Sequence, residues 1–134
     1  MQENSTFNHQ ADIVNGAIRF INSWFKQSKS ITEEMSDFFI LPGGKVIGKD
    51  VIVARLKGIF GKSDEYVGGR YDIIDANFDL LGDGKGMGFV EGVAGFRAVL
   101  KKQSKIVSGP FKLYFALQNG NWKIVNIEFP GFAY

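Results

Sequence analysis

The segment NGNWKIVNIEF, residues 119–129, decides the fold class of this chain. Its first two residues, Asn119-Gly120, form the strongest short-range signal for a β-hairpin turn. Apolar residues then alternate with polar ones, first as Trp122 and Ile124 and afterwards as Val125, Ile127 and Phe129. The change of parity predicts a β-bulge near Ile124, in the last strand of an antiparallel meander.

The residues before this hairpin, back to about Tyr66, also follow a period of two. Residues 74–80 alternate between an apolar and an acidic face, and residues 81–86 have the composition of a turn. A longer strand is expected over 87–101, then a connection over 103–109 and a strand over 111–117. Three glycines inside the long strand permit bulges and tight curvature: Gly88, Gly92 and Gly95.

The N-terminal half has helical spacing instead. Apolar residues recur every three or four positions from Ala11 to Lys26. Ser30 and Glu33 form a capping box, which predicts a short helix that ends near Leu41. A third helix is expected from Gly48–Asp50 to Gly61. The inward-facing residues of the second helix are expected to be Met35, Phe38 and Phe39. Helices followed by a meander predict an α+β fold, with the N-terminal helices packed on a strongly curved antiparallel sheet in a cone-like barrel.

Composition excludes several classes of function. A chain of 134 residues is expected to form one domain, with residues 1–10 as a polar N-terminal segment. A net charge of +2 does not predict nucleic acid or membrane as a partner. The absence of Cys excludes disulfides and thiolate chemistry, and the single His excludes a multi-histidine metal site. We therefore expect no metal, and we expect no cofactor. We also expect a cytoplasmic location, because neither a signal peptide nor a membrane span is recognisable.

The order of the elements resembles the nuclear-transport-factor-2-like superfamily. The likeness covers roughly residues 11–129 and depends on the short helices, on Gly48-Lys49-Asp50-Val51-Ile52 at the start of the third, and on the closing Asn-Gly-Asn-Trp-Lys-Ile. It implies a cone whose sheet and helices enclose a pocket, and a homodimer formed through the outer sheet face. The superfamily includes ketosteroid isomerases, polyketide cyclases, epoxide hydrolases, transport adaptors and proteins without known activity, so the fold does not choose the function.

The isomerase mechanism needs a carboxylate base and an oxyanion hole made by a tyrosine and a neutral aspartic acid. Matching the helices and the Leu41-Pro42 turn places Phe20 at the tyrosine position and Leu41 at the base position. Lys112 or Leu113 takes the position of the second acid. None of these side chains supplies the required group, so we expect no ketosteroid isomerase activity.

Other polar residues on the strands are candidates for a site. A carboxylate directed into an apolar cone would act as general acid or base, which makes Asp75, Asp79 and Glu91 the catalytic candidates. The favoured reading places Asp75 and Asp79 on a solvated face instead. Glu91 and Arg97 either pair with other sheet charges or orient a polar ligand group. The residues predicted to bind a ligand are Glu91, Arg97, Tyr114 and Trp122.

Two further segments carry local signals. Residues 43–50 match the phosphate-binding pattern G-x-x-x-x-G-K, but Asp50 replaces the Ser or Thr that binds magnesium, so the glycines are interpreted as a chain turn. His9 is expected to be a solvated residue. The apolar C-terminal residues Phe129–Tyr134 are expected to dock, either by plugging the cone or by crossing a dimer interface.

Three functions remain open. The leading hypothesis is a small-molecule-binding cone protein with an apolar pocket lined by aromatic side chains, and 13 Phe supply such a lining. The alternative is an enzyme of isomerase, cyclase or hydrolase type that acts on a small apolar substrate through a strand carboxylate. The third is a non-catalytic adaptor that binds other proteins. The direction of the strand side chains distinguishes these hypotheses.

Overall fold

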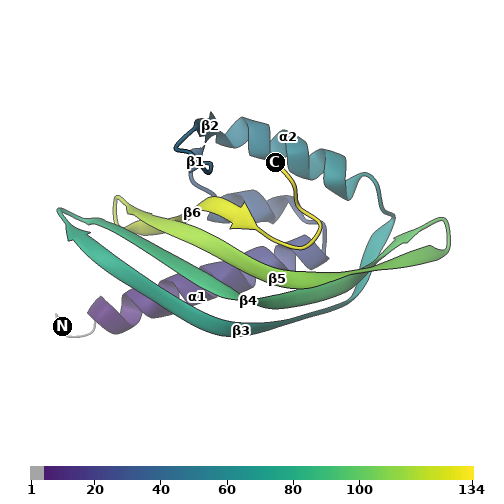
Figure 1. Ribbon diagram of the computed structural model, residues 1–134, viewed down its shortest axis with the longest axis horizontal. Coiled ribbons are helices and arrows are strands. Elements are labelled where there is room, and N and C mark those ends of the chain that lie inside the picture. Colours follow the sequence, from purple (N-terminus) through teal and green to yellow (C-terminus); the bar gives the residue numbers. More distant parts are fainter. Residues whose placement is uncertain (1–4) are drawn as a thin grey trace.

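The computed structural model describes residues 5–134, with side chains from His9 onward, and confirms the α+β fold (Figure 1). Residues 1–4 of the expected polar segment lie outside the described residues. In chain order, the elements are α1 (Ser5–Phe25), the 3-10 helix η2 (Lys29–Glu34), β1 (Phe38–Ile40), β2 (Val46–Gly48), α2 (Lys49–Phe60), β3 (Glu65–Gly82), β4 (Lys85–Leu100), β5 (Gln103–Gln118) and β6 (Asn121–Glu128).

The four long strands form one antiparallel sheet in the order β3-β4-β5-β6, as the meander predicts. We call the face that packs against α1 the inner face, and it carries the buried side chains of Val90 and Leu113. The outer face carries their neighbours along the strands, such as Glu91 and Lys112. The sheet is open, because β3 and β6 are its two edges, and Figure 1 shows its long strands bending around α1.

The curvature of β3 coincides with register shifts against β4, between Val67 and Arg70 and between Ile73 and Asp75. Gly92 on β4 lies at the second shift, where a Cβ would be only 2.0 Å from the Asp72 carbonyl oxygen. At this position, the lack of a side chain on Gly92 allows β3 and β4 to approach closely at the bulge, in agreement with the expectation that strand glycines permit bending. Ile74 is the extra residue of the bulge and is 69% exposed, so its expected place on the apolar face was wrong.

Helix α1 begins at Ser5 instead of Ala11, so the polar residues before Ala11 are helical. Two of them contact the sheet. Gln10 Nε2 donates to the Ala76 carbonyl oxygen over 3.0 Å, and His9 Nδ1 accepts the indole N–H of Trp122 over 3.0 Å. The expectation of a solvated His9 was therefore wrong, because the imidazole belongs to the contact between α1 and β6.

The second predicted helix is mostly not a helix. Residues Lys29–Glu34 form one short 3-10 segment, capped by Ser28 instead of Ser30. Strand β1 follows and pairs with β2 around a turn in which Gly43 and Gly44 have positive φ. Phe39 is buried as expected, but Phe38 is 41% exposed, because neighbouring residues of a strand point to opposite sides. Helix α2 matches the prediction closely.

Two of the three hairpins of the sheet differ in how well the sequence predicted them. Asn119-Gly120 forms the expected tight turn, and a register shift opposite Ile124 confirms the bulge. The expected connection over 103–109 was wrong, since β5 begins at Gln103. The chain turns instead through Lys101 and Lys102, whose φ values are 52° and 68°. Lysine rarely adopts this left-handed conformation, so no turn signal was visible.

Candidate functional site

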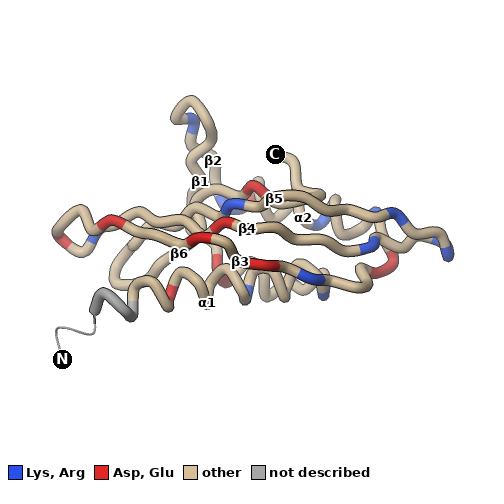
Figure 2. Tube along the Cα trace, turned by 60° about the horizontal axis from the view of Figure 1, so that its bottom comes forward, with Lys and Arg blue, Asp and Glu red and all other residues tan. Residues whose placement is uncertain are grey.

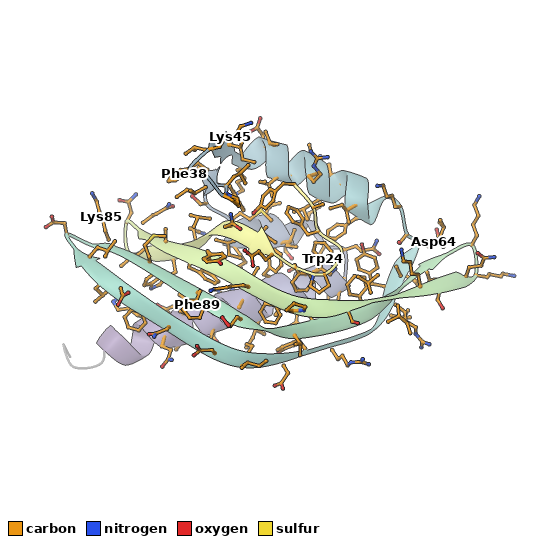
Figure 3. All side chains as sticks on the ribbon, viewed as in Figure 1. Trp24, Phe38, Lys45, Asp64, Lys85 and Phe89 are labelled. Atoms are coloured by element: carbon orange, nitrogen blue, oxygen red, sulfur yellow. The ribbon has the colours of Figure 1, made fainter. Side chains whose placement is uncertain are left out.

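Helix α1 positions the residue at the centre of the interior, Trp24. Its inner stripe recurs at helical spacing and is completely buried against the sheet. The stripe consists of Ile13, Ala17, Phe20, Ile21 and Trp24. Trp24 lies near the end of the helix, in the space between the sheet and α2 (Figure 3). Trp24 is completely buried and belongs to the core.

Aromatic rings from every layer surround Trp24, and we call this set the aromatic cluster. Phe20 comes from α1, Phe60 from α2, Tyr66 from β3, Phe96 from β4, and Phe129 and Phe132 from the C-terminal segment. Their centroids lie between 4.9 and 6.4 Å from the Trp24 ring. Each such pair typically stabilises a fold by about 0.5–1.5 kcal/mol beyond its buried area.

One polar atom inside the aromatic cluster is unsatisfied. Trp24 Nε1 is buried and has no hydrogen-bond partner among the residues that the structure describes. A buried donor left without an acceptor costs roughly 1–3 kcal/mol. The indole N–H therefore offers one directional contact to an acceptor atom placed within the cluster.

Residues Phe129–Tyr134 close the aromatic cluster, and their predicted docking is confirmed. Gly131 has φ +92°, and a Cβ there would lie 3.4 Å from both the Trp24 and the Phe96 ring. The backbone N–H of Ile127 donates to the hydroxyl of Tyr134 over 2.6 Å. Burial raises the pKa of Tyr134 to about 12; the Ile127 hydrogen bond lowers it, and Glu128 raises it further. Figure 1 shows this segment running from β6 to α2.

The three carboxylates proposed for catalysis lie on the outer face, away from the aromatic cluster. Asp75 pairs in the ladder with Glu91, and Glu91 with Lys112. The Lys112 Nζ and Glu91 Oε2 atoms are 3.7 Å apart. Asp79 lies on the same face, opposite Met87, and both Asp side chains are exposed. Asp75 and Asp79 alternate along β3 with Ala76 and Phe78, as expected from the interpretation that places both carboxylates on a solvated face.

The four residues predicted to bind a ligand are not brought together. Arg97 is exposed on the outer face near the β4–β5 turn, and Tyr114 lies farther along that face, where its hydroxyl donates to Glu128 Oε2 over 3.5 Å. Trp122 belongs to the inner face, where its N–H is used by His9. Sequence reasoning missed the Trp24 N–H, because nothing in a sequence shows which buried donor lacks an acceptor.

The described residues offer no metal site. No group of three or more His, Cys, Asp or Glu side chains that could hold a metal ion lies among them. Residues 43–50, which resemble a phosphate loop, form the β1–β2 turn, β2 and the start of α2. Within residues 5–134, no helix has both the length and the hydropathy needed to cross a bilayer.

Comparison with known proteins gives a fold. No protein-family model matches the sequence, and no curated protein matches it. A nuclear transport factor 2-like superfamily protein from Salmonella enterica has TM-score 0.70 and 21% identity, covering 97% of this chain and 95% of that chain. A putative scytalone dehydratase from Novosphingobium aromaticivorans has TM-score 0.67 and 14% identity, covering 96% and 86%. The association domain of C. elegans CaMKII has TM-score 0.57 and 12% identity, covering 92% and 96%. The chain thus has the nuclear-transport-factor-2-like fold that its sequence resembles.

Proposed function

We propose that this protein binds a small, largely apolar molecule without transforming it, and that the ligand enters the aromatic cluster. The observation that carries the proposal is the buried, unpartnered N–H of Trp24. A ligand with an aromatic or alicyclic body and one carbonyl or ether oxygen would contact the rings and accept this hydrogen bond. The candidate carboxylates point away from the cluster, which favours binding over proton-transfer chemistry.

The C-terminal segment now occupies the side of the aromatic cluster nearest α2. Phe132 and Tyr134 pack against each other at 4.9 Å, and both contact the core while remaining partly exposed. A ligand therefore competes with these two side chains for the same apolar contacts. We propose that the ligand pocket forms when the side chains of Phe132 and Tyr134 are displaced from the aromatic cluster.

The test uses a neutral fluorescent ketone, 6-propionyl-2-(dimethylamino)naphthalene. Ending the chain after Gly131 removes the competing rings, so its affinity for the ketone should rise. Trp24→Phe removes the N–H and should weaken binding by about fivefold, the value of one hydrogen bond near 1 kcal/mol. Trp122→Phe is the matched control, because that indole N–H is already used by His9. Equal affinities in all four proteins would overturn the proposal.

We also propose that the partner on the outer face is a second copy of this chain. Charge is unevenly distributed along that face: Asp75 and Glu91, with Lys112 beside Glu91, lie toward one end, and Arg70 and Arg97 lie toward the other. Figure 2 shows acidic residues along the middle of β3 and basic residues toward the β4–β5 turn. A two-fold axis across the strands, near Val93, would place opposite charges over each other.

Sedimentation of the purified protein tests this pairing. Val93 is 44% exposed and lies between the two charged regions on β4, so it would meet its equivalent in the partner. Val93→Lys should give a particle near the 14.9 kDa of one chain, and the parent protein should sediment as twice that mass. A parent protein that is monomeric at micromolar concentration contradicts the proposal. The cytoplasmic location expected from the sequence stays a prediction.

A further inference from the structure

A groove of about 400 Å³ lies between the end of α1, η2 and α2. It is distinct from the outer face and adjoins the aromatic cluster at Phe60, which lies between the groove and Trp24. That ring lines the groove and packs edge-on against Trp24 at 5.2 Å. A volume of this size lies within the range of small-molecule sites in proteins.

The floor of the groove is apolar, and hydrogen bonds hold one end of the groove together. Ile31 from η2 and Leu56 from α2 are buried beneath it, and Val53 completes the α2 side. Gln27 Nε2 at the end of α1 donates to the carbonyl oxygens of Phe60 and Ser63 over 2.9 and 3.3 Å. These bonds tie the segment that follows α1 to the C-terminal end of α2, so they hold that end of the groove together.

The rim of the groove is basic. Lys29 lines it from η2 and Lys57 from the last turn of α2. Neither ammonium group lies within 4 Å of a carboxylate of the described residues. Asp64, which also lines the groove, accepts the backbone N–H of Lys101 over 2.9 Å. The rim therefore carries two ammonium groups and one hydrogen-bonded carboxylate above an apolar floor, and this net positive charge is complementary to an apolar molecule that carries one negative charge.

We propose that this groove binds a small anionic amphiphile, an aryl or medium-chain carboxylate. Its apolar body lies over Ile31 and Leu56, and its carboxylate lies between Lys29 and Lys57. Lysine suits this role because its ammonium group is a compact charge with three donors on a flexible stem. The contacts proposed for this anion do not include Trp24, whose N–H is the contact proposed for the ligand of the aromatic cluster.

The experiment compares two fluorescent probes that share a ring system, 8-anilinonaphthalene-1-sulfonate and the neutral N-phenyl-1-naphthylamine. Substituting both Lys29 and Lys57 with Ala should weaken the sulfonate by about tenfold, the combined value of two surface ion pairs. The affinity of the neutral probe should change by less than about twofold, because its contacts are apolar. Octanoate should displace the sulfonate from the parent protein.

Helix α2 offers a test variant on the side that lines the groove and matched controls on its other side. The test variant, Val53→Trp, fills the groove and should abolish the binding of both probes to it. Val51→Trp adds the same ring at a position that is 44% exposed and lines a different surface, so binding should be unchanged. Lys62→Ala removes a cation of that other surface and should likewise have no effect. Val53→Ser gives a second measurement: it replaces an apolar side chain by a smaller, polar one without filling the groove, and it should weaken the binding of both probes.

Two results would overturn the inference. Unchanged binding in both Val53 variants means that the probes lie elsewhere, and an equal loss of both probes in the lysine variant means that charge is not recognised. The chain that ends after Gly131 separates this inference from the proposed function. That truncation acts on the aromatic cluster and leaves the groove intact. Val53→Trp should therefore weaken sulfonate binding in the truncated chain as much as it does in the full-length chain.

Discussion

Replacing Gly92 with Ala should be strongly destabilising, because the new methyl group clashes with backbone atoms of β3, which cannot move aside as the end of a flexible side chain can. The Cβ would lie 2.0 Å from the carbonyl oxygen of Asp72 and 3.0 Å from its carbonyl carbon. Relief requires the bulge of β3 to move by roughly 1 Å, at an overpacking cost of about 1–3 kcal/mol. Loss of one ladder hydrogen bond adds about 1 kcal/mol. We expect a total near 3 kcal/mol and a melting temperature lower by about 10 °C.

Thermal and urea unfolding, followed by circular dichroism, measure this loss. Gly58→Ala is the matched control, because its Cβ on the exposed side of α2 meets nothing within 4 Å. That substitution should stabilise by roughly 0.5–1 kcal/mol. Gly95→Ala should fall between the two, since its closest contact is a Ser108 side-chain carbon at 3.1 Å. A Gly92→Ala protein as stable as the parent would refute the assignment of the bend to this close approach.

Three further predictions concern single groups. Because burial raises the pKa of Tyr134 to about 12, its docking should contribute fully below the unfolded value near 10 and be lost between about 10 and 12. Tyrosinate absorbance compared with Tyr134→Phe checks this, and a Tyr134 that ionises near 10 contradicts it. Glu34→Gln removes the ion pair with Arg19, which is 59% exposed, so urea unfolding should show a loss below about 1 kcal/mol that shrinks with salt. A salt-independent loss above about 2 kcal/mol would refute that reading. Finally, an unsaturated ketosteroid should not be turned over, since Phe20 is buried core and Leu41 has no carboxylate; turnover blocked by a cone ligand would disprove this.

The fold was readable where one local signal agreed with its surroundings. Asn119-Gly120 correctly predicted a hairpin, and the parity change correctly predicted the bulge opposite Ile124. Both predictions depend on turn chemistry and side-chain alternation, which are short-range properties of the sequence. The segment Phe38–Ile40 was misread because Phe38 and Phe39 continue the helical spacing of Met35. Its strand depends on pairing with Val46–Gly48, which helical spacing alone does not show.

The candidate site was harder to predict than the fold. Alternation correctly separates Glu91 from Val90, but it does not say which face of the sheet the helices cover. The charges of Glu91 and Arg97 suggested a polar lining, and they lie on the outer face. Lys29 and Lys57 are distant in sequence, and only the fold places both of them along one groove.

Strand β3 has an edge that is long and unpaired, and this has a consequence for how the protein avoids self-association while it folds. An edge of 18 residues presents free backbone groups on which another chain can add a strand. Three register shifts and the exposed carboxylates of Asp72, Asp75 and Asp79 interrupt that template. We therefore expect these residues to act as gatekeepers against misassembly. Replacing them with Asn should first appear as a lower yield of folded protein, so any loss of function in such variants has to be corrected for the amount that folds.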